Sequence, residues 1–180
     1  MHLHNLTWDV KMAYTWAPLP AGDRIAIVYP DGFKRQKDGE ECYAVLEANL
    51  YGHPSAGRGW AQHRDGFILS RFNEKGWSCR RCVHDPCLFV IDRYPESLGE
   101  SPLGQQPPSG HTGDSLPDPE VDPKDDLPDG VHRSWVLIHT DDCDAYGTSM
   151  DVLHEINDIM NDRWTTEIVD SSFVLGEPTM

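Results

Sequence analysis

Two adjacent carboxylates, Asp141 and Asp142, are the side chains in this sequence whose type and position best suit chemistry. They closely follow the apolar run 136–138, and a second short strand-like stretch leads from them to Gly147. Charge beside a buried strand is costly unless another group compensates it. A hard divalent cation such as magnesium can do so, because it takes carboxylate oxygens as ligands. Asp9 lies in another strand-like run and offers a third carboxylate, although solvated turn aspartates are the usual interpretation of an isolated Asp-Asp pair.

Six short motifs, in the same order along the chain, resemble those of copia-type retrotransposon reverse transcriptases. The family patterns D-V-K-T-A-F, Q-P-E-G-F, Y-G-L-K-Q-A-P-R-A-W, D-P-S-L-F, Y-V-D-D and F-L-G are similar to residues 9–14, 30–33, 51–60, 85–89, 139–142 and 173–176. One such motif is weak evidence, whereas six in the family's order are specific. The resemblance covers nearly the whole chain and omits only residues 92–132.

The resemblance implies an RNA-directed DNA polymerase that joins nucleotides with the help of two magnesium ions about 3.5–4 Å apart. Its catalytic and metal-binding residues would be Asp9, Asp141 and Asp142, with Asp141 the firmer ligand and Asp142 the supporting one. Side chains alternate between the faces of a strand, so Asp141 and Asp142 need not coordinate equally. We therefore expect Asp9 and Asp141 to meet, with strand 5–10 beside hairpin 135–146 in one sheet.

The resemblance also assigns two nucleotide-binding residues. Tyr14 would lie under the incoming sugar and exclude a ribose 2′-hydroxyl, which favours deoxynucleotides. Arg58 would bind a phosphate through the rigid donor fork of its guanidinium. The alternatives are a half-buried aromatic for Tyr14 and a solvated charge near a helix start for Arg58. The expected partners are an RNA or DNA template-primer and deoxynucleotides.

Several positions depart from the family's pattern. Pro54 and Ser55 replace its Lys and Gln, Asp144 adds a charge to a strand that should pack, and His139 replaces a tyrosine. Much of the fingers, the thumb and the ribonuclease H segments of relatives are missing from the sequence. We therefore expect an incomplete fragment that is inactive alone, and the alternative is a non-catalytic relic or interaction module.

Apolar periodicity predicts two helices. Helix 55–74 would carry Trp60, Phe67, Ile68 and Phe72 on one face and stop at Gly76. Helix 150–163 would begin at a capping box, Thr148 to Asp151. Its apolar stripe predicts core packing and consists of Val152, Leu153, Ile156, Ile159 and Met160.

Strands are predicted at about 5–10, 24–29, 42–46, 87–92, 165–169 and 172–175, with a hairpin at 135–146. The order strand, helix, strand pair, helix, strand is that of ferredoxin-like folds. The sequence thus predicts an α+β fold, a ferredoxin-like polymerase palm in which two helices cover one face of an antiparallel sheet.

The charge of the chain argues against the polymerase interpretation. The sequence has 180 residues and a formal net charge of −15, whereas proteins that bind nucleic acid usually carry basic patches. Residues 92–132 hold ten acidic residues against Arg93 and Lys124, a net charge of −8, which leaves −7 for the remainder.

Residues 94–132 are rich in Pro, Gly, Ser and Asp and contain few large apolar residues. Such a segment cannot bury enough surface to offset the entropy of ordering it. It predicts a disordered acidic insert between two parts of a palm, residues 1–93 and 133–180. A partner-binding segment is the alternative.

The five cysteines and the hydropathy pattern bear on the compartment. No apolar run approaches the ~20 residues of a membrane span, and the first residues do not resemble a signal peptide. An odd cysteine count without such a signal predicts reduced thiols. We expect an intracellular protein, cytoplasmic or nuclear, that is neither secreted nor in a membrane.

Four further residues suggest a rival site. Cys79, Cys82, His84 and Cys87 are the ligand types of a tetrahedral zinc centre, and C-x-x-C is its usual opening. However, all four fall within nine residues, and the usual second half of such a site is absent. Buried thiols are the favoured interpretation, and a small zinc-binding module is the other alternative function.

Limited proteolysis can test the predicted insert. A protease of broad specificity should cut first within residues 95–130, because unstructured chain is the most accessible. Mass spectrometry of the first fragments would locate the cut. First cleavage in either flanking part would contradict the prediction.

Overall fold

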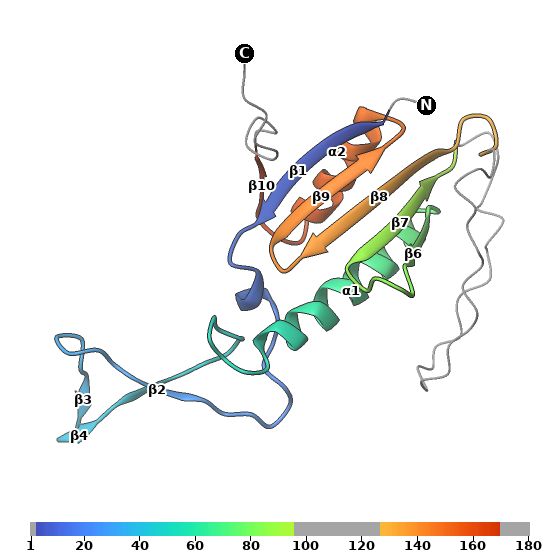
Figure 1. The fold of residues 1–180 in the computed structure, drawn as a ribbon. Helices are drawn as coiled ribbons and strands as arrows, with labels where there is room; N and C mark the ends of the chain where they lie inside the picture. The colour runs from blue at the N-terminus through green and yellow to red at the C-terminus, as the bar shows by residue number, and fades with distance from the viewer. Residues whose placement is uncertain (1–2, 96–126, 170–180) are drawn as a thin grey trace, which may run out of the picture. The chain divides into compact units, whose positions relative to one another are not determined.

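The computed structural model describes residues 3–95 and 127–169 (Figure 1). Most of the predicted insert, the predicted strand 172–175 and the segment similar to F-L-G lie outside these residues. The chain divides into two compact units, Met1–Lys11 with Gly66–Met180, and Met12–Asp65. Each unit is described by itself.

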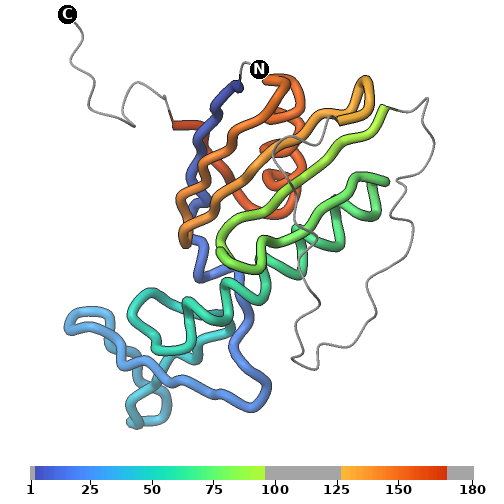
Figure 2. The backbone as a smooth tube through the Cα atoms, turned by 45° about the vertical axis from the view of Figure 1, so that its right-hand side comes forward, coloured from blue at the N-terminus to red at the C-terminus, as the bar shows by residue number. Residues whose placement is uncertain are grey.

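The larger unit contains a six-stranded antiparallel sheet in the order β10-β1-β9-β8-β7-β6 (Figure 2). Its strands are β1 (His4–Val10), β6 (Ser78–Arg81), β7 (Leu88–Arg93), β8 (His132–His139), β9 (Asp142–Gly147) and β10 (Thr166–Val169). Together with two helices, this sheet confirms the α+β class. It also confirms that the first strand lies beside the predicted hairpin, because β1 pairs with β9 and β9 with β8. Strand β6 was not predicted.

The residues of the central strands alternate between two faces. On β1, Leu6, Trp8 and Val10 are at most 7 % exposed, whereas the residues between them are half-buried. Cys143 and Ala145 of β9 are fully buried and continue the same face. Helix α2 (Met150–Asn161) covers this face and contacts β1, β8, β9 and β10. The opposite face of the sheet is called the open face below.

Helix α2 is stabilised as its apolar stripe predicts, since all five stripe residues are buried. The predicted capping box begins at the wrong residue. The N-cap is Ser149, whose hydroxyl oxygen accepts from the backbone N–H of Val152 at 3.5 Å. Thr148 lies one residue earlier, with its hydroxyl 3.4 Å from Nδ1 of His132.

Helix α1 (Ala56–Glu74) matches the predicted helix 55–74. In its second half, Ile68 and Phe72 are at most 1 % exposed, and the ring of Phe67 packs edge-on against Trp164 at 4.8 Å. The chain leaves the helix through Gly76, whose φ of +78° is readily adopted only by glycine. Within the residues that the structure describes, no helix is both long enough and apolar enough to cross a membrane.

The smaller unit contains the first half of α1, the short helix η1 (Ala13–Trp16) and two small hairpins. Strand β2 (Ala26–Val28) pairs with β5 (Tyr43–Val45), and β3 (Gln36–Lys37) pairs with β4 (Glu40–Glu41). The strands at 24–29 and 42–46 are confirmed, and the β3–β4 hairpin was not predicted. Asn49 is buried, and its side-chain amide donates to the carbonyl oxygens of Ala17 and Pro18. These hydrogen bonds connect the chain after β5 to the chain after η1.

The N-cap of α2 gives a test of the fold. Replacing Ser149 with Ala should lower the free energy of unfolding by about 1 kcal/mol, because the backbone N–H of Val152 loses its acceptor. Thr148→Ala is the matched control and should cost less. Urea denaturation of both variants would measure the difference, and a larger loss for Thr148→Ala would restore the predicted capping box.

Candidate functional site

Asp9 and Asp142 are direct neighbours across the β1–β9 pair. The next pair in this register is Val10 with Asp141, and the backbone N–H of Val10 donates to the carbonyl oxygen of Asp141 at 2.8 Å. Hydrogen-bonded and non-hydrogen-bonded pairs alternate in antiparallel sheets, so Asp9 and Asp142 form a non-hydrogen-bonded pair. Their Cα atoms are then about 4.5 Å apart and their side chains are close. Both side chains lie on the open face, opposite to buried Trp8 and Cys143.

Asp141 takes a different position from the one expected. It is the second residue of the two-residue turn between β8 and β9, after Thr140, whose φ is +59°. Asp9 therefore has Asp142, not Asp141, as its direct cross-strand neighbour. Asp141 reaches β1 through its main-chain carbonyl, and its side chain is half-buried in the turn. The register does not test the firmer and supporting ligand roles of Asp141 and Asp142, which stay predictions.

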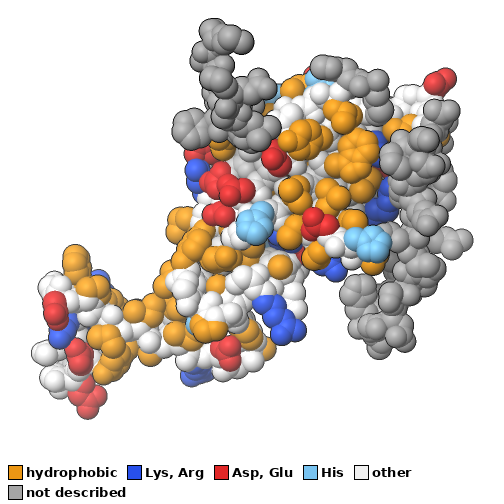
Figure 3. All heavy atoms as spheres, viewed as in Figure 1, with side chains coloured by type: hydrophobic (Ala, Val, Ile, Leu, Met, Phe, Trp, Pro, Cys, Tyr) orange, Lys and Arg blue, Asp and Glu red, His pale blue; other side chains and the backbone are white. Residues whose placement is uncertain are grey.

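A row of polar residues crosses four strands on the open face. Glu167 of β10 is opposite Asp9, Asp9 is opposite Asp142, and Asp142 is opposite His139 of β8. In Figure 3, acidic side chains gather on this face toward β10 and β1, and hydrophobic ones gather over β8 and β9, where Leu137 and Tyr146 are exposed. The row places three carboxylates in consecutive cross-strand positions.

Asp144 adds a fourth carboxylate to the open face. Its Oδ1 accepts from the hydroxyl of Thr7 at 2.7 Å and from the amide of Asn5 at 3.4 Å, both on β1. The sequence suggested that this charge would disturb a packed strand. It does not, because the alternation of β9 turns Asp144 away from α2 and toward hydrogen-bond donors.

Lys11 holds the Asp9 carboxylate. Its Nζ lies 2.9 Å from Oδ2 of Asp9 and 2.8 Å from Oε2 of Glu167, so it bridges β1 and β10. Hydrogen bonds to Glu167 and then to Asp9 raise the pKa of Lys11, and Lys11 lowers the pKa of Glu167. Neither role was predicted. The contact of Lys11 with Asp9 could have been predicted from their spacing, because residues two apart in extended chain share a face.

The donor chemistry of Asp9 and Asp142 suits magnesium, which takes carboxylate oxygens. The arrangement, however, does not form a complete cage. Among the residues that the structure describes, no three His, Cys, Asp or Glu side chains are arranged to hold a metal ion. A cation would also meet the Lys11 ammonium at Asp9. Asp9 and Asp142 alone are therefore an incomplete ligand set. A divalent cation would need further ligands from Asp141, water or substrate, and it would compete with Lys11 for Oδ2 of Asp9.

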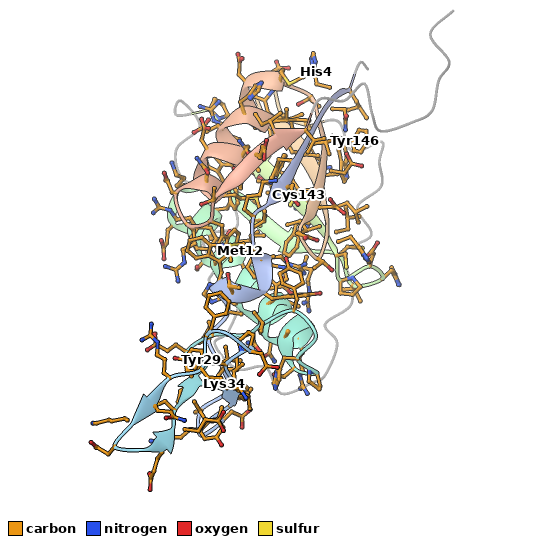
Figure 4. All side chains as sticks on the ribbon, turned by 90° about the vertical axis from the view of Figure 1, so that its left-hand side faces the viewer. His4, Met12, Tyr29, Lys34, Cys143 and Tyr146 are labelled. Atoms are coloured by element: carbon orange, nitrogen blue, oxygen red, sulfur yellow. The ribbon has the colours of Figure 1, made fainter. Side chains whose placement is uncertain are left out.

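The two predicted nucleotide-binding residues belong to the smaller unit. Tyr14, in η1, packs its ring against Tyr51 at 4.5 Å, and a Cβ added to Gly57 would lie 4.0 Å from its hydroxyl. Arg58 is the next residue after Gly57 and is exposed in the first turn of α1. The unit therefore places the Tyr14 hydroxyl near Gly57, the residue before Arg58. Met12, at the start of η1 (Figure 4), adopts a φ of +55° that is rare outside glycine.

The residues of the rival zinc site lie around the β6–β7 hairpin. Cys79 is within β6 on the face that the core covers, and burial raises the pKa of its thiol to about 12. Cys82 and Cys87 lie in the connecting loop, where the backbone N–H of Cys87 donates to Asp85 at 2.9 Å. In the part of the chain that the structure describes, the side chains of the rival site do not form a group that could hold a metal ion. The structure thus gives Cys79 a place in the core.

Asp92 of β7 is a buried carboxylate on the open face, near the β6 edge of the sheet. It is only 2 % exposed, and Arg133 grips its two oxygens at 2.7 and 3.0 Å. Arg80 adds a third contact at 3.2 Å. These three residues join β6, β7 and β8, so this buried carboxylate stabilises the sheet and offers no open ligand position.

Comparisons with protein-family models, with curated proteins and with solved structures found no match.

The Cys79 thiol predicts a pH dependence of stability. Above about pH 9 the thiol ionises in the unfolded chain but stays protonated in the fold up to about pH 12, so unfolding is favoured as the pH rises. The expected loss is at most about 1.4 kcal/mol per pH unit. Urea denaturation between pH 8 and pH 10.5 should show a shallower slope for Cys79→Ala than for the wild type. Cys42→Ala, at a half-buried thiol, is the control, and equal slopes for both variants would contradict the prediction.

Proposed function

We propose that this chain is a fragment of a reverse transcriptase palm of the copia type, which would support RNA-directed DNA synthesis by a two-metal mechanism. One observation carries the proposal: Asp9 and Asp142 oppose each other on adjacent strands, with Asp141 in the turn beside them. These are the carboxylates that the motif resemblance singled out, although they are 133 positions apart in the sequence. Opposed carboxylates on separate strands are what a pair of bridged cations requires.

The topology supports the proposal. When β2 to β7 and η1 are set aside, the elements β1, α1, β8, β9, α2 and β10 come in the order strand, helix, two strands, helix and strand. Their strands stand in the order β10-β1-β9-β8, which is the arrangement of a split βαβ fold, and β7 and β6 extend it at one edge. A ferredoxin-like palm is therefore the proposed finer class of this α+β fold.

Each group in the proposed mechanism has a separate task. Bound magnesium would stabilise charge on the attacking and leaving oxygens of the transferred phosphate. Asp9 and Asp142 would hold the cations and fix their position relative to the sheet. Tyr14 would exclude a 2′-hydroxyl by its bulk, and Arg58 would donate to a phosphate. Asp144, already satisfied by Thr7 and Asn5, would remain outside the site.

The carboxylate pair can be tested through the stability of the protein. Magnesium should raise the melting temperature, because a ligand at 100 times its Kd stabilises the fold by about 2.7 kcal/mol. Asp142→Asn should weaken this response, since it removes the carboxylate opposite Asp9. Asp144→Asn is the matched control, because it removes a charge two residues away on the same face, and it should keep most of the response.

Nucleotide binding distinguishes a polymerase from a non-catalytic relic. With magnesium and an RNA template-primer, a deoxynucleoside triphosphate should stabilise the chain more than the ribonucleotide does. Tyr14→Ala should reduce this difference. Equal magnesium responses in Asp142→Asn and Asp144→Asn, without any effect of nucleotide, would instead support a non-catalytic interaction module.

A further inference from the structure

The Asp9 carboxylate has a counter-ion of its own. Lys11 Nζ lies within 2.9 Å of Asp9 and within 2.8 Å of Glu167, which stand opposite each other in the β1–β10 register. The backbone also holds this lysine in place, because its N–H donates to the carbonyl oxygen of Thr165 at 2.8 Å. The ammonium therefore occupies the approach to Asp9 from the β10 side.

The other carboxylate of the pair, Asp142, has a different environment. Asp142 forms no ion pair with any residue that the structure describes, and it is exposed. One carboxylate of the pair is thus neutralised by the chain itself and the other is open to solvent. A cation that arrives at Asp142 can bind Oδ2 of Asp9 only in competition with the ammonium, which lies 2.9 Å from that oxygen.

We propose that Lys11 is a built-in counter-ion that a divalent cation must displace from Asp9, so that the Lys11–Asp9–Glu167 bridge lowers the cation affinity of the site. This inference rests on the proposed function, since it concerns the same carboxylates. With no cation bound, the bridge offsets the repulsion between opposed carboxylates and keeps β10 against β1. On cation binding, Lys11 keeps its contact with Glu167 and releases Asp9.

The chain contains a well-matched control lysine. Lys34, labelled in Figure 4, also bridges two carboxylates, with Nζ 3.1 Å from Asp31 and 3.8 Å from Glu41. The exposure of the two lysine side chains is similar, 47 % for Lys11 and 52 % for Lys34. Each substitution by Met removes one positive charge, so any effect of net charge alone appears in both variants.

The test is a titration with manganese(II), followed by its electron paramagnetic resonance signal, which reports bound metal without any need for activity. Lys11→Met should bind manganese about three- to tenfold more tightly than the wild type, because an exposed ion pair and its repulsion of the metal are removed. Lys34→Met should bind as the wild type does. Unchanged or weaker binding by Lys11→Met would overturn the inference.

Asp142→Asn in the same titration keeps the two proposals apart. If this variant binds as tightly as the wild type, the carboxylate pair is not the site and the proposed function fails. If it binds more weakly while Lys11→Met matches Lys34→Met, only the counter-ion inference fails. As a second measurement, manganese should speed the reductive methylation of Lys11 and leave that of Lys34 unchanged, and no change at Lys11 would contradict displacement.

Discussion

The register between β1 and β9 is the constraint on which the rest of the structure depends. It puts Trp8 opposite Cys143 on the face that α2 covers, and Asp9 opposite Asp142 on the open face. Because side chains alternate along a strand, a slip of β1 by one residue would turn Asp9 toward α2 and Trp8 toward the open face, while Asp142 of β9 would stay where it is. The same register therefore determines both the packing of the core and the position of the candidate site. The burial of Trp8 stabilises this register and so keeps the two aspartates opposite each other.

Three aspartates of the sheet have different kinds of partner. Asp92 is buried and is held by Arg133 and Arg80, which makes it part of the framework. Asp144 accepts hydrogen bonds from β1. Asp9 has an exposed lysine as its partner, an interaction of the kind that contributes little to stability and can be exchanged. The carboxylate with the most replaceable partner is the one that faces Asp142. A cation at the proposed site would therefore replace a weak surface ion pair and leave the buried contacts of the sheet in place.

Much of the fold could be predicted from the sequence, because apolar periodicity marks both helices and most strands of the sheet. Strand β6 was missed because Ser-Cys-Arg-Arg has no apolar alternation, and it forms through its pairing with β7. The candidate carboxylates could be predicted from their motifs, but the pairing of Asp9 with Asp142 could not, since the length of the turn sets it. Lys11 directly follows β1 and meets Glu167 of β10, so only the tertiary register shows this contact.

We propose that Asp9 and Asp142 together form one divalent-cation site. Amide nuclear magnetic resonance spectra at substoichiometric manganese(II) can locate such a site, because a bound paramagnetic ion broadens the signals of nearby residues. Binding at this pair should selectively broaden residues 8–10 together with 141–143, and the broadening should be lost in Asp142→Asn and retained in Asp144→Asn. Broadening centred on the acidic residues between 96 and 126, with 8–10 and 141–143 unaffected, would contradict it.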